Sequence, residues 1–109
     1  MVVVQDGEFM FPYVKKADTF LRRFRGLMLR KRLEEGEGLL LENCGRIHTN
    51  FMRFVIDAVY LSEEYEVLFC ETVAPWKLGK KVRGAKHVLE LPKGSGAALR
   101  MGEKIQLIG

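Results

Sequence analysis

The residues best able to do chemistry lie in one short stretch, between positions 44 and 61. Cys44, His48 and Met52 recur every four residues there. Thiolate, imidazole and thioether are soft ligands, which suit Cu(I) and, without the methionine, zinc. The sequence lacks the paired Cys-x-x-Cys and His-x-x-x-His spacings typical of zinc sites. We therefore expect Cys44 and Met52 to fill the core, His48 to donate to a neighbour, and no metal or cofactor to be bound.

His48 and Asp57 offer a different chemistry, a base with its orienting carboxylate, with Thr49 or Cys44 as the nucleophile. On an extended strand Cys44 and His48 would be about 13 Å apart, too far for proton transfer unless the chain bends. No Gly-x-Ser-x-Gly elbow occurs in the sequence. A hydrolase-like enzyme using His48 and Asp57 is thus the alternative, and a non-catalytic domain is the expectation.

A buried polar network is another use of these residues. Arg25, His48, Asp57 and Glu90 could converge to fix one packing arrangement or to line a ligand pocket. Two carboxylates, Asp57 and Glu90, would also suit glycoside hydrolysis. Because Asp57 alternates with apolar residues, we expect it to be buried and structural, with Arg25 as its first-choice partner. Trp76, in a basic loop, could stack on a base or a sugar.

Positive charge is concentrated in two places. Residues 15–32 contain eight Lys and Arg residues against the single Asp18, and residues 77–86 contain five more. Such patches attract phosphate groups, so a nucleic-acid-associated module is a further alternative. A solvated helix face and a solvated loop are the simpler interpretation, and nucleic acid is not the expected partner. We expect Arg22, Arg23 and the 77–83 loop to be exposed.

Length and composition indicate one globular domain over residues 1–109, with 48% hydrophobic and 29% charged residues. No apolar run approaches the ~20 residues of a membrane span, and the first residues lack the basic region of a signal peptide. The two cysteines are too few for a disulfide scaffold. A cytoplasmic protein is therefore expected, and Glu and Lys enrichment with few Asn and Gln residues is typical of thermophiles.

Hydrophobic periodicity predicts mostly strands, at 2–4, 9–14, 39–41, 53–61, 65–73, 87–91 and 104–108. Asp6-Gly7 predicts a turn, Pro12 an edge strand or a break, and residues 97–100 a single helical turn. Residues 53–61 and 65–73 should form an antiparallel hairpin with both faces of the first strand buried. One main helix is predicted at about 18–31, capped by Asp18 or Thr19. The expected fold is α+β, mainly β: a small barrel-like antiparallel sheet with one helix.

Several motifs then occur in a fixed order: Arg25-Gly26-Leu27-Met28, Ile47-His48-Thr49, Met52-Arg53-Phe54, Ile56-Asp57, Pro75-Trp76 and Val88–Gly94. In these the chain resembles the domain-of-unknown-function family 192, also called uncharacterised protein family 0127, over about residues 17–108. The chain departs from it at Val55, where the family usually has proline, and at Glu63-Glu64, which replaces an Asp-Gly type turn. The resemblance implies a compact β-rich single domain and no particular activity.

Together these observations favour a non-catalytic domain that binds a small molecule or a protein through a pocket near His48. The candidate ligand-binding residues are Arg25, Cys44, His48, Thr49, Met52, Asp57, Trp76 and Glu90.

Overall fold

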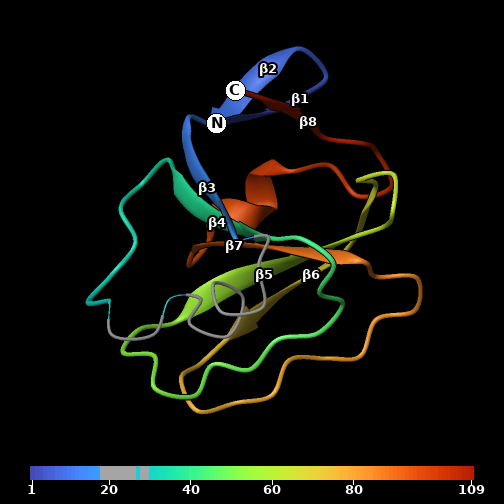
Figure 1. Cartoon of the computed structure of the whole chain (residues 1–109). Coiled ribbons are helices and arrows are strands. Elements are labelled where there is room, and N and C mark those ends of the chain that lie inside the picture. The colour runs from blue at the N-terminus through green and yellow to red at the C-terminus, as the bar shows by residue number, and fades with distance from the viewer. Residues whose placement is uncertain (18–26, 28–29) are drawn as a thin grey trace.

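Two β-sheets make up the protein over residues 1–17, 27 and 30–109, the part that the computed structural model describes (Figure 1). The smaller sheet has three antiparallel strands in the order β2-β1-β8, and the larger has five in the order β3-β4-β7-β5-β6. Only the β3–β4 pair is parallel. The strands are β1 (Val2–Gln5), β2 (Glu8–Phe11), β3 (Tyr13–Ala17), β4 (Glu37–Leu41), β5 (Ile56–Leu61), β6 (Val67–Val73), β7 (His87–Pro92) and β8 (Gln106–Ile108), and the 3-10 turn η1 spans Ser95–Ala98.

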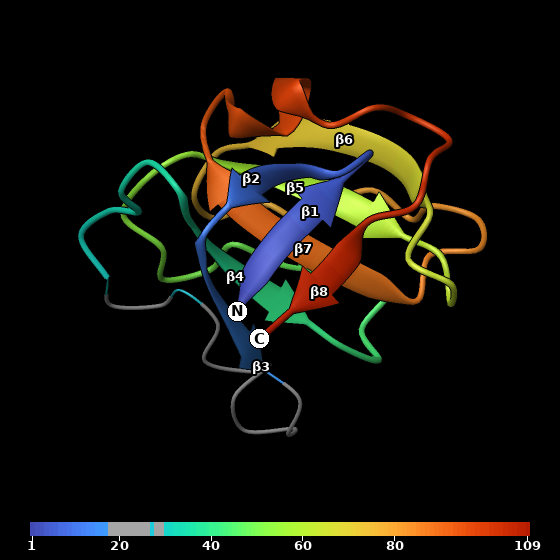
Figure 2. The ribbon, with the colours of Figure 1, turned by 90° about the horizontal axis from the view of Figure 1, so that it is seen from above.

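The predicted barrel-like sheet is wrong, because the two sheets do not close on one another. The five-stranded sheet ends in β3 on one side and β6 on the other, and the three-stranded sheet lies across it, over β5 and β7 (Figure 2). The helix expected at 18–31 falls mostly outside the described residues, and positions 27, 30 and 31 are not helical. In the described part, η1 is the one helical element, and no helix there is long and apolar enough to cross a bilayer.

The predicted hairpin of the larger sheet is confirmed. β5 and β6 pair antiparallel from Ile56↔Val73 to Leu61↔Val67, although β5 begins at residue 56 rather than 53. The break expected at Pro12 is also present, but its consequence is larger than the sequence suggested. β2 ends at Phe11 in the small sheet, and β3 starts at Tyr13 in the large one, where it runs parallel to β4.

Strand β5 is buried along its whole length and separates two apolar cores. Val59 and Leu61 face the core between the sheets, which Val3 of β1 closes from the other side. Ile56, Ala58 and Tyr60 face a second core on the opposite side of the large sheet. Alternate side chains of a strand point to opposite faces, so an apolar residue at nearly every position reflects burial on both sides.

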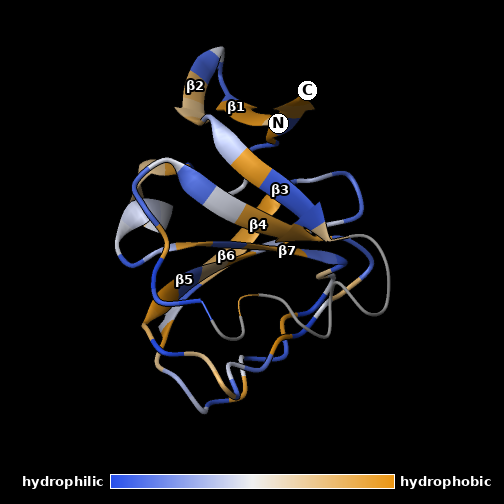
Figure 3. Ribbon diagram, turned by 60° about the vertical axis from the view of Figure 1, so that its left-hand side comes forward, coloured by the Kyte–Doolittle hydropathy of each residue, from blue (hydrophilic) through white to orange (hydrophobic). Residues whose placement is uncertain are grey.

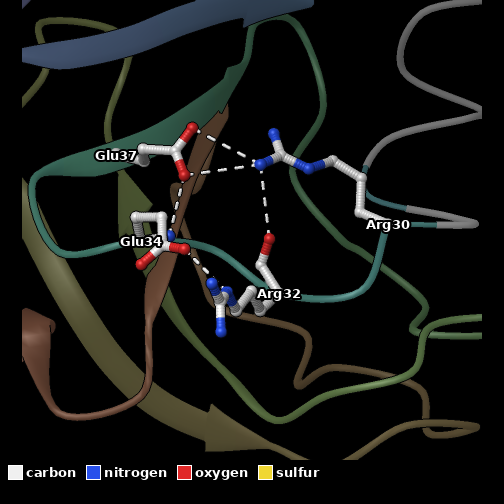
Figure 4. A network of polar contacts seen from close by, with 4 residues as sticks. All are labelled: Arg30, Arg32, Glu34 and Glu37. Atoms are coloured by element: carbon white, nitrogen blue, oxygen red, sulfur yellow. Dashed lines mark hydrogen bonds and ion pairs between the residues drawn. The ribbon is translucent and has the colours of Figure 1, made fainter.

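The segment entering β4 is shaped by a polar network of four residues (Figure 4). Arg30 Nη2 lies 3.4 Å from both carboxylate oxygens of Glu37, and the Glu34 N–H donates to Glu37 Oε1 at 2.7 Å. A second ion pair joins Arg32 to Glu34 at 2.6 Å. The Glu34 N–H bond, followed by the Arg30 contact, holds the pKa of Glu37 below its usual range. These contacts orient the turn that delivers the chain to β4.

Asp57 ties η1 to the large sheet. Its carboxylate is buried, and it accepts hydrogen bonds from Thr72 Oγ1 at 2.9 Å and from the Gly96 N–H at 2.8 Å. Gly96 must be a glycine, because a Cβ there would lie 2.4 Å from Cys70 Sγ. Burial, and then the charge of Asp57, raises the pKa of the Cys70 thiol to about 11. The burial expected for Asp57 is thus confirmed, while Arg25 lies outside the described residues.

We predict that Asp57→Asn lowers the free energy of unfolding by about 1–3 kcal/mol. Thr72 and Gly96 donate to different oxygens of Asp57, and the amide replaces one of those oxygens with an NH2 donor. The amide also lacks the negative charge that strengthens both bonds. Thermal melts of the wild type and the variant measure the loss. Glu64→Gln, at an exposed position of the β5–β6 turn, is the matched control and should leave the midpoint unchanged. An unchanged or raised melting midpoint for Asp57→Asn would contradict a structural role for this carboxylate.

A candidate binding surface formed by two loops

Two long loops lie side by side at the end of the molecule farthest from the small sheet (Figure 1). We call residues 44–54 and 74–86 the loop face. Its central residue is Thr49, which is fully buried. The Thr49 hydroxyl donates to the Ala74 carbonyl at 2.6 Å and accepts from the Lys77 N–H at 2.8 Å, and the Thr49 carbonyl accepts from the Trp76 N–H at 2.9 Å. Thr49 therefore fixes one loop against the other.

Further backbone contacts extend this junction along both loops. The Gly79 N–H donates to the Ile47 carbonyl, and Arg46 Nε donates to the Gly79 carbonyl, both at 2.9 Å. A Cβ at Gly79 would lie 2.5 Å from the Tyr60 hydroxyl, so the loop sits directly on the sheet. That hydroxyl donates to Glu71 at 2.5 Å, and its burial raises the pKa of Tyr60 well above its usual range. The loop face is thus a braced surface.

Three large apolar side chains project from this surface: Phe51, Trp76 and Leu78, the apolar trio. They are 58%, 60% and 63% exposed, respectively. Phe51 and Trp76 have left-handed backbones, with φ of 66° and 61°, which is uncommon for bulky residues. Their rings pack on each other with centroids 4.7 Å apart and planes tilted by 57°. Because such a backbone costs free energy, the surrounding hydrogen bonds must hold it in place.

The loop face is also strongly basic. It contains seven exposed Lys and Arg residues and no Asp or Glu, whereas the rest of the chain has eleven basic residues against fourteen acidic ones. The loop face is thus one of the two basic clusters of the chain, the other being residues 15–32. Within the described part of the chain, none of the seven forms an ion pair with a carboxylate. They are Arg46, Arg53, Lys77, Lys80, Lys81, Arg83 and Lys86.

Hydrophobic and hydrophilic segments alternate along these loops (Figure 3). The exposure expected for the charged residues of the 77–83 loop is confirmed, and Arg22 and Arg23 lie outside the described residues.

The loop face collects several of the candidates found in the sequence. Thr49 and Trp76 form its centre, and His48 is exposed beside Leu78, with Nδ1 accepting from the Asn50 N–H at 3.3 Å. Met52 is buried in the second core, and the Cys44 thiol donates to the Arg46 carbonyl at 3.0 Å. Among the described residues, no three His, Cys, Asp or Glu side chains are grouped closely enough to hold a metal ion.

Phe51 and Leu78 were not among the candidates, although both belong to the apolar trio. Each lies in a loop segment without acidic residues: Phe51 stands between Asn50 and Met52, and Leu78 stands between Lys77 and Gly79. That context was a usable signal, because large apolar residues in a basic, glycine-containing loop have no periodic face to occupy. Their exposure depends on local backbone geometry, which the pattern does not encode.

The two carboxylates Asp57 and Glu90 do not come together. In the β5–β7 register Asp57 pairs with Leu91 and Ala58 pairs with Glu90. Residues directly opposite each other share a sheet face, so Asp57 faces the core between the sheets and Glu90 faces the second core. The carboxylate pair considered for glycoside hydrolysis is therefore not formed. Asp57 bonds to Thr72 and Gly96 rather than to His48, so the hydrolase dyad is not formed either.

Glu90 is an unusual buried carboxyl group. It is 2% exposed, and its Oε1 atom has no hydrogen-bond partner in the described structure. Its neighbours across the strands are Leu39 and Ala58. Burial raises the pKa of Glu90 to about 8, so the group is mostly protonated at neutral pH.

We predict that Thr49→Val lowers stability by about 1–3 kcal/mol and loosens the apolar trio, because the Lys77 N–H loses its bond to the Thr49 hydroxyl. Trp76 is the single tryptophan, so its fluorescence anisotropy reports the loosening directly. Thr49→Ser, which keeps the hydroxyl, is the control and should retain most of the wild-type anisotropy. Equal behaviour of the Val and Ser variants would show that the hydroxyl does not brace the loops.

We predict that Glu90→Gln flattens the pH dependence of stability. The folded-state pKa of about 8 lies above the model-compound value of 4.5. Folding therefore retains a proton between those values, and stability falls as pH rises through that window by up to about 1.4 kcal/mol per pH unit. Urea melts at about pH 5 and about pH 8, near the two ends of this window, measure the slope. The exposed-site variant Glu63→Gln should keep the wild-type slope, and an equally steep slope in Glu90→Gln would contradict the assignment.

Known proteins resemble this chain in sequence and in fold. A UPF0127 protein of Pyrococcus furiosus is 34% identical over 111 residues, which cover 97% of this chain and 96% of that protein. A UPF0127 protein of Thermococcus sibiricus is 38% identical over 85 residues, covering 74% of this chain. The matched part is 55% of the T. sibiricus protein, so the chain spans little more than half of that relative. Both organisms are thermophilic archaea, in keeping with the Glu- and Lys-rich composition.

A crystal structure of a protein of unknown function from Novosphingobium aromaticivorans shares the fold, with a TM-score of 0.83 and 18% identity. The match covers 97% of this chain and 83% of that one. At this identity the likeness concerns the fold alone. The model of family DUF192, described as an uncharacterised ACR, matches residues 1–107. The chain therefore belongs to the DUF192 family, also named UPF0127.

Proposed function

We propose that this protein is a non-catalytic binding domain and that the loop face is its recognition surface. The observation that carries the proposal is the apolar trio, held outward on loops that contain seven cations and no acidic residue of their own. The Glu71 carboxylate of β6 lies against these loops and accepts from the Lys80 N–H at 2.8 Å. Single exposed apolar residues are normal on protein surfaces. A group of large ones, two of them on left-handed backbones, is typical of an interaction site.

The bracing of the loops supports recognition by a preformed surface. Thr49 holds the 74–77 segment by its hydroxyl, its N–H and its carbonyl. A surface that is ordered before its partner arrives loses less conformational entropy on binding. The surface includes His48, near which the sequence predicts a pocket, and we infer that binding takes place on the exposed side chains of this surface.

The chemistry of the surface defines the kind of partner it would favour. Apolar contacts with the trio and charge contacts with the surrounding Lys and Arg residues require a partner that is both negatively charged and partly apolar. A hydrolase built on His48 and Asp57 has weaker support, because both carboxylate oxygens of Asp57 are engaged by Thr72 and Gly96.

Heparin is a suitable polyanionic probe for the charged part of the surface. Titration at low salt should change the fluorescence of Trp76, and added salt should reverse the change because the attraction is electrostatic. The double variant Lys77→Ala, Lys81→Ala should weaken binding several-fold. The control pair Lys93→Ala, Lys104→Ala removes the same charge outside the loop face and should have a smaller effect. Equal losses in both pairs, or no response of Trp76, would overturn the proposal.

A further inference from the structure

The apolar trio and the seven cations of the loop face form a combination that suits a charged lipid surface. We infer that the loop face docks on the surface of an anionic lipid bilayer. This inference rests on the proposed function and specifies the class of partner. It concerns attachment to the bilayer surface through loop side chains.

The exposure of the trio indicates insertion into a soft surface. Side chains that are 58–63% exposed project from the protein rather than line a groove. Trp, Phe and Leu are the residues that enter the headgroup and upper acyl region of a bilayer, where Trp is particularly favoured because its ring is apolar and its N–H is polar. The braced loops would present the contacting rings of Phe51 and Trp76 together, with Leu78 two residues beyond Trp76 on the same loop.

The charges around the trio favour an anionic bilayer over a neutral one. Each Lys or Arg near such a surface adds to the attraction, and seven lie on the loop face. Outside the loop face, the sequence has a second basic cluster at residues 15–32 and is otherwise mostly acidic. Seven cations and no acidic residue within the two loops give the loop face a positive potential that would attract negative lipid.

Single-stranded nucleic acid fits these side chains less well. Bases stack on accessible ring faces that follow a basic groove. Here the two rings pack against one another at 4.7 Å with a 57° tilt, and the third member of the trio is an aliphatic leucine. The geometry therefore favours an apolar wedge in lipid over a stacking platform.

Vesicles test the inference directly, with Trp76 as the reporter. Vesicles of mixed phosphatidylglycerol and phosphatidylcholine should co-sediment with the full chain and shift the Trp76 emission to shorter wavelength. Pure phosphatidylcholine vesicles should do neither, and high salt should weaken the binding.

Phe51→Ala should lower the partition coefficient by about tenfold, because less apolar surface is buried. Lys77→Ala with Lys81→Ala should lower it by about tenfold or more.

Control variants distinguish binding by the loop face from nonspecific adsorption of exposed apolar residues to vesicles. Phe9 on β2 is 74% exposed and lies outside the loop face, so Phe9→Ala should leave partitioning unchanged. Thermal melts should show unchanged midpoints for Phe51→Ala and Phe9→Ala, because both side chains are exposed. Equal losses of partitioning in the two variants would overturn the inference.

The heparin titration distinguishes the two levels of the proposal. Heparin binding without vesicle binding would overturn the lipid inference and leave the proposed function standing. Failure with both probes would overturn both. Oligodeoxythymidylate that binds more tightly than the vesicles, with Trp76 quenched on binding, would also overturn the lipid inference, because the anionic partner would then be a nucleic acid.

Discussion

Burial of β5 on both faces is the constraint on which the rest of the structure depends. All six of its side chains are buried, three toward each core. A strand covered on both sides needs neighbours at both edges as well, which β6 and β7 provide. The antiparallel pairing of Ile56 with Val73 then brings the segment entering β5 and the segment leaving β6 to the same end of the sheet. The loop face is the product of that register.

Holding two cationic loops together opposes their mutual repulsion. The structure counters this with short-range bonds, most of them from Thr49 and from the backbone around Gly79. The left-handed conformations of Phe51 and Trp76 add a further cost. Charge repulsion and backbone strain are thus both opposed by the Thr49 and Gly79 bonds, and strain of this kind is common at functional sites.

Sequence reasoning recovered the parts of the fold that depend on local patterns. The alternation of 53–61 and 65–73 predicted the β5–β6 hairpin, and Pro12 marked the break before β3. Apolar residues on both faces of β5 did not distinguish a barrel from two stacked sheets, because both bury a strand twice. Asp57 and Glu90 were grouped because their types match, but a one-residue difference in long-range register sends them to opposite faces. The exposure of Phe51 and Leu78 is set by loop geometry, which no periodicity describes.

The carboxyl group buried at Glu90 makes folding a reaction that exchanges hydrogen ions with the solvent. In the unfolded chain this side chain is ionised at neutral pH, and in the native sheet it is mostly neutral. Each molecule that folds near pH 7 must therefore take up close to one hydrogen ion at this position. An unbuffered solution of refolding protein would become more alkaline, and the acidity of the compartment would act directly on the folding equilibrium.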